Sequence, residues 1–281
     1  MSRIIACIDG SPSATAVCDY AAWASLRLDA PLTLLHVLDR ALYPLKRDLS
    51  GSIGLGSREQ LLEELAELDE QRARLARQQG ELMLESAQAR VLAAGVPRVE
   101  SRQRHGDLIE VLNTLAAETR LLVIGKRGQN STEAWQLIGS QVENTLRSLQ
   151  RPILVASAAF QAPQSIMLAF DGSSTAFKAV DMLATSPLFR GLPLHLVAVG
   201  ERHQQSLSAA AQRLQKAGFD IHPKLLLSGA VETALLDYLA QHSIDLLVMG
   251  AYGHSRIREF LVGSTTTSLL HNTTLPLLIV R

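Results

Sequence analysis

The sequence has little cysteine, no excess of charge of either sign and no long hydrophobic run. Its 281 residues include two cysteines, Cys7 and Cys18, which form neither a disulfide framework nor the spacing of a zinc site. Lysine and arginine total 27, and aspartate and glutamate also total 27. This balance does not favour a nucleic-acid partner or an anionic membrane, because both select a basic surface. Without a run of about 18 apolar residues, we expect no membrane-spanning helix.

The apolar residues that are present suffice for folded cores. Hydrophobic residues make up 47% of the chain, which is ample for two domains of ordinary size. The first residues enter an apolar strand at once, without the hydrophobic segment of a signal peptide. We therefore expect a cytoplasmic protein.

The chain consists of two similar halves. The Asp-Gly-Ser at 9–11 matches the Asp-Gly-Ser at 171–173 at an offset of 162 residues, and the apolar runs that follow match at the same offset. Later glycines and the two closing apolar runs also correspond. Repetition of this length is typical of duplicated domains. We predict one domain at 1–158 and a second at 163–281.

Each half alternates apolar runs with segments of helical periodicity. Near-continuous apolar strands that alternate with helices are typical of an α/β fold, in which a parallel sheet is covered on both faces. In each half, Asp-Gly-Ser supplies turn and cap residues at the start of the first helix. The predicted early elements are helices at Ala16–Leu26 and Ala176–Leu183, and strands at Leu32–Val37, Leu194–Val199, Val99–Arg104 and His222–Leu227.

The halves differ mainly in the crossover after their second strand. It holds 57 residues between Val37 and Gly95, but 18 between Val199 and Gly218. The first half therefore carries an insertion at about 38–94, and the shorter crossover predicts a less covered edge in the second half.

The insertion contains a narrow leucine stripe. One interpretation is a long amphipathic helix that lies on its own sheet. The alternative is a helix presented to a partner subunit, because Arg72 and Gln79 interrupt the stripe at coiled-coil core positions. The leucines of the stripe are Leu61, Leu65, Leu68, Leu75 and Leu82.

A glycine motif near the end of the chain predicts a phosphate-binding site. Gly250 and Gly253 follow an apolar run, and nine residues separate Gly253 from Gly263-Ser264-Thr265. Glycines let backbone N–H groups approach a ligand, and a helix that begins at Ser264 presents a positive end to phosphate. If the first and fourth strands are neighbours, Asp171 lies at the same edge. Its carboxylate can accept a hydrogen bond from a ribose hydroxyl or hold a Mg²⁺ ion that bridges phosphates.

The pattern G-x2-G-x9-G-[ST], with Asp at the end of the first strand, resembles the universal stress proteins of the tandem two-domain type. The resemblance covers essentially the whole chain. It implies strand order 3-2-1-4-5 in each five-stranded domain, an adenine-nucleotide site at the strand ends, and contact between the domains through Ile153–Val155 and Leu277–Val280. The residues that it implies are Asp171 for ribose or metal, Val199 and Met249 for adenine, and Gly250, Gly253, Gly263, Ser264 and Thr265 for ribose and phosphates.

The first half departs from this pattern. Ten residues separate its second and third motif glycines, and Gln141 replaces the second hydroxyl residue. Against this, its aspartate is intact, and Lys126 and Arg127 could neutralise phosphate. Its weaker candidate residues are Asp9, Val37, Gly125, Gly128, Gly139 and Ser140.

Together these features predict a stress-response or regulatory protein that binds ATP, with Mg²⁺ as an expected companion, mainly in its second half. No GxxxxGK[ST] loop is present, and no motif serine has a histidine base at a recognisable spacing. We therefore expect a binding protein without catalytic residues. A slow ATPase or autophosphorylating enzyme, and a module for a non-nucleotide ligand, are the alternatives. A homodimer is compatible with the sequence, which does not decide it.

Overall fold

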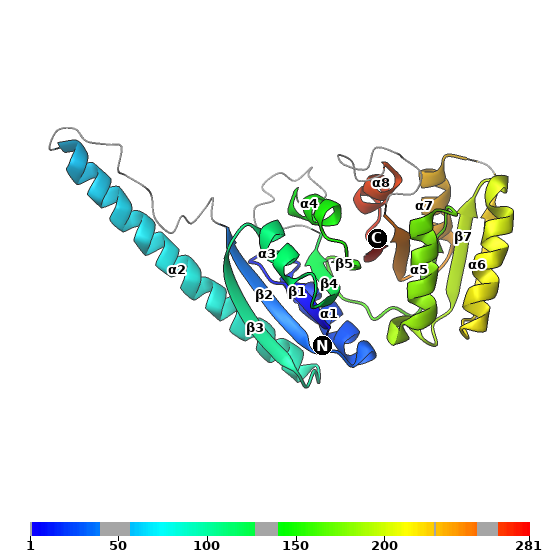
Figure 1. Ribbon diagram of the computed structural model, residues 1–281, viewed down its shortest axis with the longest axis horizontal. Helices are drawn as coiled ribbons and strands as arrows, with labels where there is room; N and C mark the ends of the chain where they lie inside the picture. The colour runs from blue at the N-terminus through cyan, green and yellow to red at the C-terminus, as the bar shows by residue number, and fades with distance from the viewer. Residues whose placement is uncertain (1, 40–56, 127–139, 228, 252–263) are drawn as a thin grey trace.

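The structure, a computed structural model, describes residues 2–39, 57–126, 140–227, 229–251 and 264–281 (Figure 1). Strands and helices alternate through both halves, as the sequence predicts. The first half contains β1 (Arg3–Cys7), α1 (Ala14–Leu28), β2 (Leu32–Asp39), α2 (Ser57–Ala93), β3 (Val99–Gly106), α3 (Leu108–Leu115), β4 (Thr119–Gly125), α4 (Ser140–Ser148) and β5 (Ile153–Ala156). The second contains β6 (Ile166–Ala169), α5 (Ser174–Thr185), η1 (Pro187–Phe189), β7 (Leu194–Val199), η2 (Glu201–His203), α6 (Gln204–Lys216), β8 (Ile221–Leu226), α7 (Val231–Gln241), β9 (Leu246–Gly250), α8 (Ser264–Asn272) and β10 (Leu277–Val280).

The strands form one ten-stranded sheet in the order β3-β2-β1-β4-β5-β10-β9-β6-β7-β8. Each half therefore has the order 3-2-1-4-5, which confirms the predicted fold class. The strands pair in parallel except at the junction of the halves, where β5 and β10 are antiparallel and Leu154 lies opposite Leu278. The expected contact between the fifth strands is confirmed.

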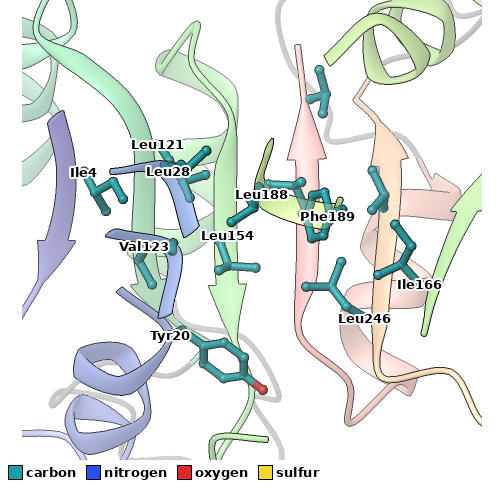
Figure 2. Packing of buried hydrophobic residues seen from close by; sticks show 14 of the residues in the cluster. Ile4, Tyr20, Leu28, Leu121, Val123, Leu154, Ile166, Leu188, Phe189 and Leu246 are labelled. Atoms are coloured by element: carbon teal, nitrogen blue, oxygen red, sulfur yellow. The ribbon is translucent and has the colours of Figure 1, made fainter. Parts of the chain in front are cut away.

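Apolar residues cover both faces of this sheet. The core on one face lies under α1, α2, α5 and α6, and the core on the other face lies under α3, α4, α7 and α8. Both cores contain residues of both halves. Figure 2 shows Leu188 and Phe189 between Leu154 of β5 and Leu246 of β9. Phe189 has no exposed surface, and burial of such a side chain contributes about 1.5–3 kcal/mol.

Two cations at the junction hold helices of the opposite half. Arg281, after β10, donates to the carbonyl oxygens of Arg147 at 2.5 Å and Leu149 at 3.2 Å, at the end of α4. Lys126, after β4, donates to the carbonyl oxygen of Thr273 at 2.6 Å, at the end of α8. Cations at helix C-termini are favourable because the last carbonyls carry partial negative charge.

The long helix α2 packs on its sheet with a different face from the one that the leucines define. Ala76, Leu84, Ala87 and Val91 are buried, at helical spacing. A Cβ atom on Gly80 would lie 2.6 Å from Cδ2 of His36, so α2 crosses the sheet too closely for large side chains. The predicted long helix on its own sheet is confirmed, since α2 contacts β2 and β3, but the leucine stripe is not the face that meets the sheet.

Four leucines of the stripe, from Leu65 onward, are exposed instead, and the N-terminal part of α2 extends away from the sheet (Figure 1). The exposed fractions are 41% for Leu65, 49% for Leu68, 60% for Leu75 and 66% for Leu82.

Candidate functional site

The candidate site of the second half lies at the carboxyl ends of two neighbouring strands. β6 and β9 pair in parallel, with Ala169 opposite Met249. Asp171 follows β6, and Gly250 ends β9. The chain leaves β6 toward β7 on one side and returns to β9 on the other. The neighbouring position of the first and fourth strands is thus confirmed, at the kind of switch point where open α/β sheets hold ligands.

Asp171 organises the turn that starts α5. Its Oδ1 accepts a hydrogen bond from the N–H of Ser173 at 3.0 Å. Gly172 between them has a φ of 71°, a conformation that glycine adopts without a Cβ penalty. The Ser173 hydroxyl oxygen in turn accepts a hydrogen bond from the N–H of Ala176, at 3.1 Å, and so caps the helix. The carboxylate is therefore held at this edge by the backbone of its own turn.

The crossover after β7 packs against the same turn. A Cβ atom on Gly172 would lie 3.1 Å from Oγ of Ser206 and 3.3 Å from Nδ1 of His203. His203 is buried, and its Nε2 accepts a hydrogen bond from Nε of Arg202 at 2.9 Å. The short crossover thus covers the Asp171 turn more closely than the sequence predicts. The sequence did not predict a role for Arg202, His203 and Ser206 here, because contacts between a crossover and a distant turn leave no periodic pattern in the sequence.

Gly250 is required by packing. A Cβ atom there would lie 2.8 Å from both the backbone nitrogen of Ala176 and the carbonyl carbon of Thr175. Real Cβ atoms do not approach backbone this closely, so the end of β9 meets the first turn of α5 only because residue 250 has no side chain. The next N–H, of Ala251, donates to the carbonyl of Val280 at 2.7 Å. Sequence reasoning gave Gly250 a ligand contact and missed this packing role.

The two residues expected beside adenine differ in exposure. Val199 ends β7 and is half-buried. Met249 is 5% exposed and belongs to the core under α7 and α8. Val199 packs against this same core, so the two side chains share one face of the sheet.

The phosphate motif is described in part. Ser264 is the first residue of α8, and Thr265 follows it in the first turn, where it is half-buried. The first N–H groups of a helix have no partner within the helix. Gly253 and Gly263 lie outside the residues that the structure describes.

The first half repeats the aspartate turn with more hydroxyl contacts. Oδ1 of Asp9 accepts hydrogen bonds from the N–H of Ser11 at 3.1 Å and from its hydroxyl at 2.5 Å. The Ser11 and Ser13 hydroxyls lie 2.8 Å apart. Val37, in β2, is half-buried. The turn that precedes α1 is therefore closed by its own side chains.

The motif of the first half is also described in part. Gly125 ends β4 and Ser140 begins α4, while Gly128 and Gly139 lie in the stretch 127–139, for which the structure gives no description. Lys126, which we considered for phosphate, donates across the junction to Thr273.

The cysteines have little thiolate character. Burial, and secondly the charge of Asp9, raises the pKa of Cys7 to about 12. Burial, and secondly the charge of Asp19, raises the pKa of Cys18 to about 11. A nucleophilic cysteine needs a lowered pKa, so neither thiol is suited to covalent catalysis.

The residues that the structure describes contain neither a metal-binding cluster nor a membrane-spanning helix. Within the described ranges, no group of three or more His, Cys, Asp or Glu side chains is placed to hold a metal ion. No helix among them is both long enough and apolar enough to cross a membrane.

Comparisons with known proteins agree with this architecture. The profile of the universal stress protein family matches residues 1–157 and 198–281. A universal stress protein of Synechocystis sp. is 38% identical over 288 residues, which cover 100% of each chain.

Solved structures show the same fold. A universal stress protein from Archaeoglobus fulgidus has a TM-score of 0.73 at 18% identity, with 99% of this chain and 98% of that chain covered. A protein of unknown function from Pseudomonas aeruginosa has a TM-score of 0.59 at 15% identity, with 100% and 92% covered. With both halves matched and a relative similar along its full length, the chain belongs to the universal stress protein family, in a tandem arrangement.

Proposed function

We propose that this chain is a cytoplasmic stress-response protein that binds an adenine nucleotide, ATP with Mg²⁺, in its second half. One observation carries the proposal: Asp171 and the end of β9 lie at the carboxyl ends of two neighbouring strands, β6 and β9. The chain leads from β9 to the start of α8, and the positive end of a helix attracts phosphate. Membership of the family supports the same ligand.

We assign each part of the nucleotide to the residues whose chemistry suits it. Gly253, Gly263, Ser264 and Thr265 would supply hydroxyls and N–H groups to ribose and phosphates. Asp171 would accept a hydrogen bond from a ribose hydroxyl or bind Mg²⁺, which is coordinated by carboxylate and phosphate oxygens. Met249 and Val199 would contact adenine from the apolar side. Gly250 would contribute by letting β9 approach α5.

We assign the two domains to 1–158 and 163–281 and expect the first to bind nucleotide more weakly. Its candidate residues are Asp9, Val37, Gly125, Gly128, Gly139 and Ser140. Asp9 is engaged by both the N–H and the hydroxyl of Ser11, and Gln141 follows Ser140 in α4. A non-nucleotide ligand is therefore the alternative for this half.

Binding is favoured over catalysis. Phosphoryl transfer needs a positioned nucleophile in addition to charge neutralisation, and the raised pKa values leave both cysteines protonated. Slow hydrolysis or autophosphorylation is the second candidate. Binding alone can regulate, since a ligand at 100 times its dissociation constant stabilises the bound state by about 2.7 kcal/mol.

The central experiment is calorimetric titration of ATP·Mg into wild type, Asp171→Asn and Asp9→Asn. Asparagine retains an oxygen for the N–H of Ser173, so the turn persists while the charge is lost. A hydrogen bond to a charged group contributes about 1.5–3 kcal/mol, so Asp171→Asn is expected to lose about 10- to 100-fold in affinity. Asp9→Asn is the matched control and is expected to leave the tight site unchanged. Equal affinity of wild type and Asp171→Asn for ATP·Mg would contradict the proposed site.

A turnover assay separates binder from enzyme. We expect steady-state ATP hydrolysis well below about 1 s⁻¹, the lower end of the usual range for enzymes. Faster turnover that survives further purification and responds to Asp171→Asn would replace binding by catalysis as the function.

A further inference from the structure

The helix before the last strand of each half is held at its C-terminal end by a cation of the other half. Lys126, directly after Gly125 of β4, donates from Nζ to the carbonyl oxygen of Thr273, at 2.6 Å, at the end of α8. Arg281, after β10, donates from Nη1 to the carbonyl oxygen of Leu149, at 3.2 Å, at the end of α4. Thr273 and Leu149 occupy the same position in the two halves, three residues before the proline that precedes the closing strand. The same carbonyl of each half therefore receives a cation from across the junction.

The two cations are not copies of one another. In the duplicated sequence, Lys126 corresponds to Ala251, and Arg281 corresponds to Ser157. Ala251 is 3% exposed and apolar, and the hydroxyl of Ser157 donates to the carbonyl oxygen of Ala159 at 2.7 Å. Unrelated positions thus supply a donor to equivalent carbonyls, so duplication alone does not account for the two contacts.

The acceptor end of the Lys126 contact is fixed. Thr273 is 6% exposed. Its N–H donates to the carbonyl oxygen of Leu269 at 3.0 Å, and its hydroxyl oxygen accepts a hydrogen bond from the N–H of Leu275 at 3.1 Å. Lys126 itself is half-buried. A hydrogen bond from a charged donor is stronger than a neutral one, and salt screens it less where water is partly excluded.

The helix α8 connects this contact to the proposed nucleotide site. It runs from Ser264 to Asn272, which makes it roughly 14 Å long. Leu269 and Leu270 have no exposed surface and attach α8 to the core, but apolar burial is non-directional. The hydrogen bond from Lys126 adds a directional contact at the C-terminal end. Because a short helix moves as one piece, a bond that fixes its last turn also fixes its first turn.

We propose that Lys126 is a positioning residue for nucleotide binding in the opposite half. By fixing the last turn of α8, it holds the first turn, at Ser264 and Thr265, in place to bind phosphate. The inference rests on the proposed function. Good N–H···O hydrogen bonds span only about 2.7–3.2 Å, so a shift of about 1 Å in the first turn removes them. Since Lys126 directly follows Gly125, the motif of one half supports the phosphate-binding helix of the other.

Calorimetric titration of ATP·Mg into wild type, Lys126→Met and Arg281→Met tests this role. Each variant loses one cation and its contact across the junction, so both should melt about 2–4 °C lower. Lys126→Met is expected to lose about 10-fold in affinity, the equivalent of one hydrogen bond. Arg281→Met releases only the helix of the first half and should keep wild-type affinity. Lys126→Arg retains a charged donor and should restore most of the affinity.

Two further titrations exclude other routes to the same loss. In the Asp9→Asn background, a loss on Lys126→Met that persists belongs to the second half, whereas a loss that disappears shows that Lys126 serves the first half directly. Raising the salt from about 0.1 M to about 1 M shortens the Debye length from about 10 Å to about 3 Å. The affinity ratio of wild type to Lys126→Met should persist, because positioning does not depend on long-range attraction.

The outcomes separate this inference from the proposed function. Wild type that binds no ATP·Mg would overturn both. Wild type that binds, with equal affinity in Lys126→Met or with equal losses in Lys126→Met and Arg281→Met, would overturn the positioning role alone. A loss that disappears in the Asp9→Asn background or at high salt would do the same.

Discussion

Gly250→Ala tests whether the glycine after β9 serves packing or ligand contact. The substitution adds one methyl group at a position outside the left-handed region, since Gly250 is not among the glycines of positive φ. Its whole cost therefore comes from contact. The added Cβ atom would lie 2.8 Å from the nitrogen of Ala176 and 3.0 Å from the carbonyl oxygen of Thr175. These are backbone atoms of the first turn of α5, which cannot rotate away as a side chain can.

The expected loss follows from this rigidity. Overpacking a tight site typically costs about 1–3 kcal/mol, and we expect the upper end here. In chains of roughly 150–250 residues each kcal/mol shifts the unfolding midpoint by about 2–4 °C, so Gly250→Ala should melt about 6–12 °C lower. Gly191→Ala is the control: its Cβ atom meets nothing within 4 Å, and its φ is 82°. That variant should lose only about 1 kcal/mol, the conformational penalty of a left-handed residue.

Thermal unfolding of both variants without nucleotide, followed by ATP·Mg titration, separates the two roles. If packing requires the glycine, Gly250→Ala loses stability before any ligand is added, and loses affinity because the Asp171 turn moves with α5. A Gly250→Ala protein that melts with wild type refutes the packing argument. Loss of affinity with unchanged melting would assign Gly250 to the ligand.

Two further predictions concern titratable groups. Burial, and secondly the charges of His222 and His242, lowers the pKa of His195 below its ordinary 6.5. The unfolded chain therefore binds a proton at His195 more readily than the folded chain does. The free energy of unfolding should keep its full value above about pH 6.5 and fall as the pH drops below it. His195→Gln should shrink the fall in melting temperature between about pH 7.5 and about pH 5.5, and an unchanged fall would assign it to other groups. Cys7 and Cys18, with raised pKa values, should resist a thiol reagent in native buffer and react on denaturation, whereas rapid native labelling would show that the thiols are accessible.

The candidate site shows how far local signals reach. Asp171-Gly172-Ser173 is visible in the sequence because a turn and a helix cap use neighbouring residues, and the structure has that turn. His203 and Ser206 beside it were missed, because they come from a different crossover. Gly250 was noticed for its place after an apolar run, but the backbone of α5 that excludes a side chain there was not visible.

The helix α2 shows the same division. Its leucine repeat is plain in the sequence, yet which face meets the sheet depends on the close approach at Gly80 to His36 and Gln103. Small residues on the other face permit that approach. The leucine repeat by itself does not show that a different face of α2, with Ala76, Leu84 and Ala87, meets the sheet.

The sequence by itself determined the duplication, the alternation of strands and helices, and the aspartate and glycine motifs at the strand ends. These follow from composition, periodicity and turn chemistry, which act between residues near one another in the chain. Only the tertiary structure decided that Lys126 and Arg281 hold helices of the opposite half, that Gly250 packs on α5, and that Leu65, Leu68, Leu75 and Leu82 of α2 are exposed while Leu84 is buried. The reason is physical: contacts between distant segments depend on how closely their backbones can approach, and that distance is set by the whole fold.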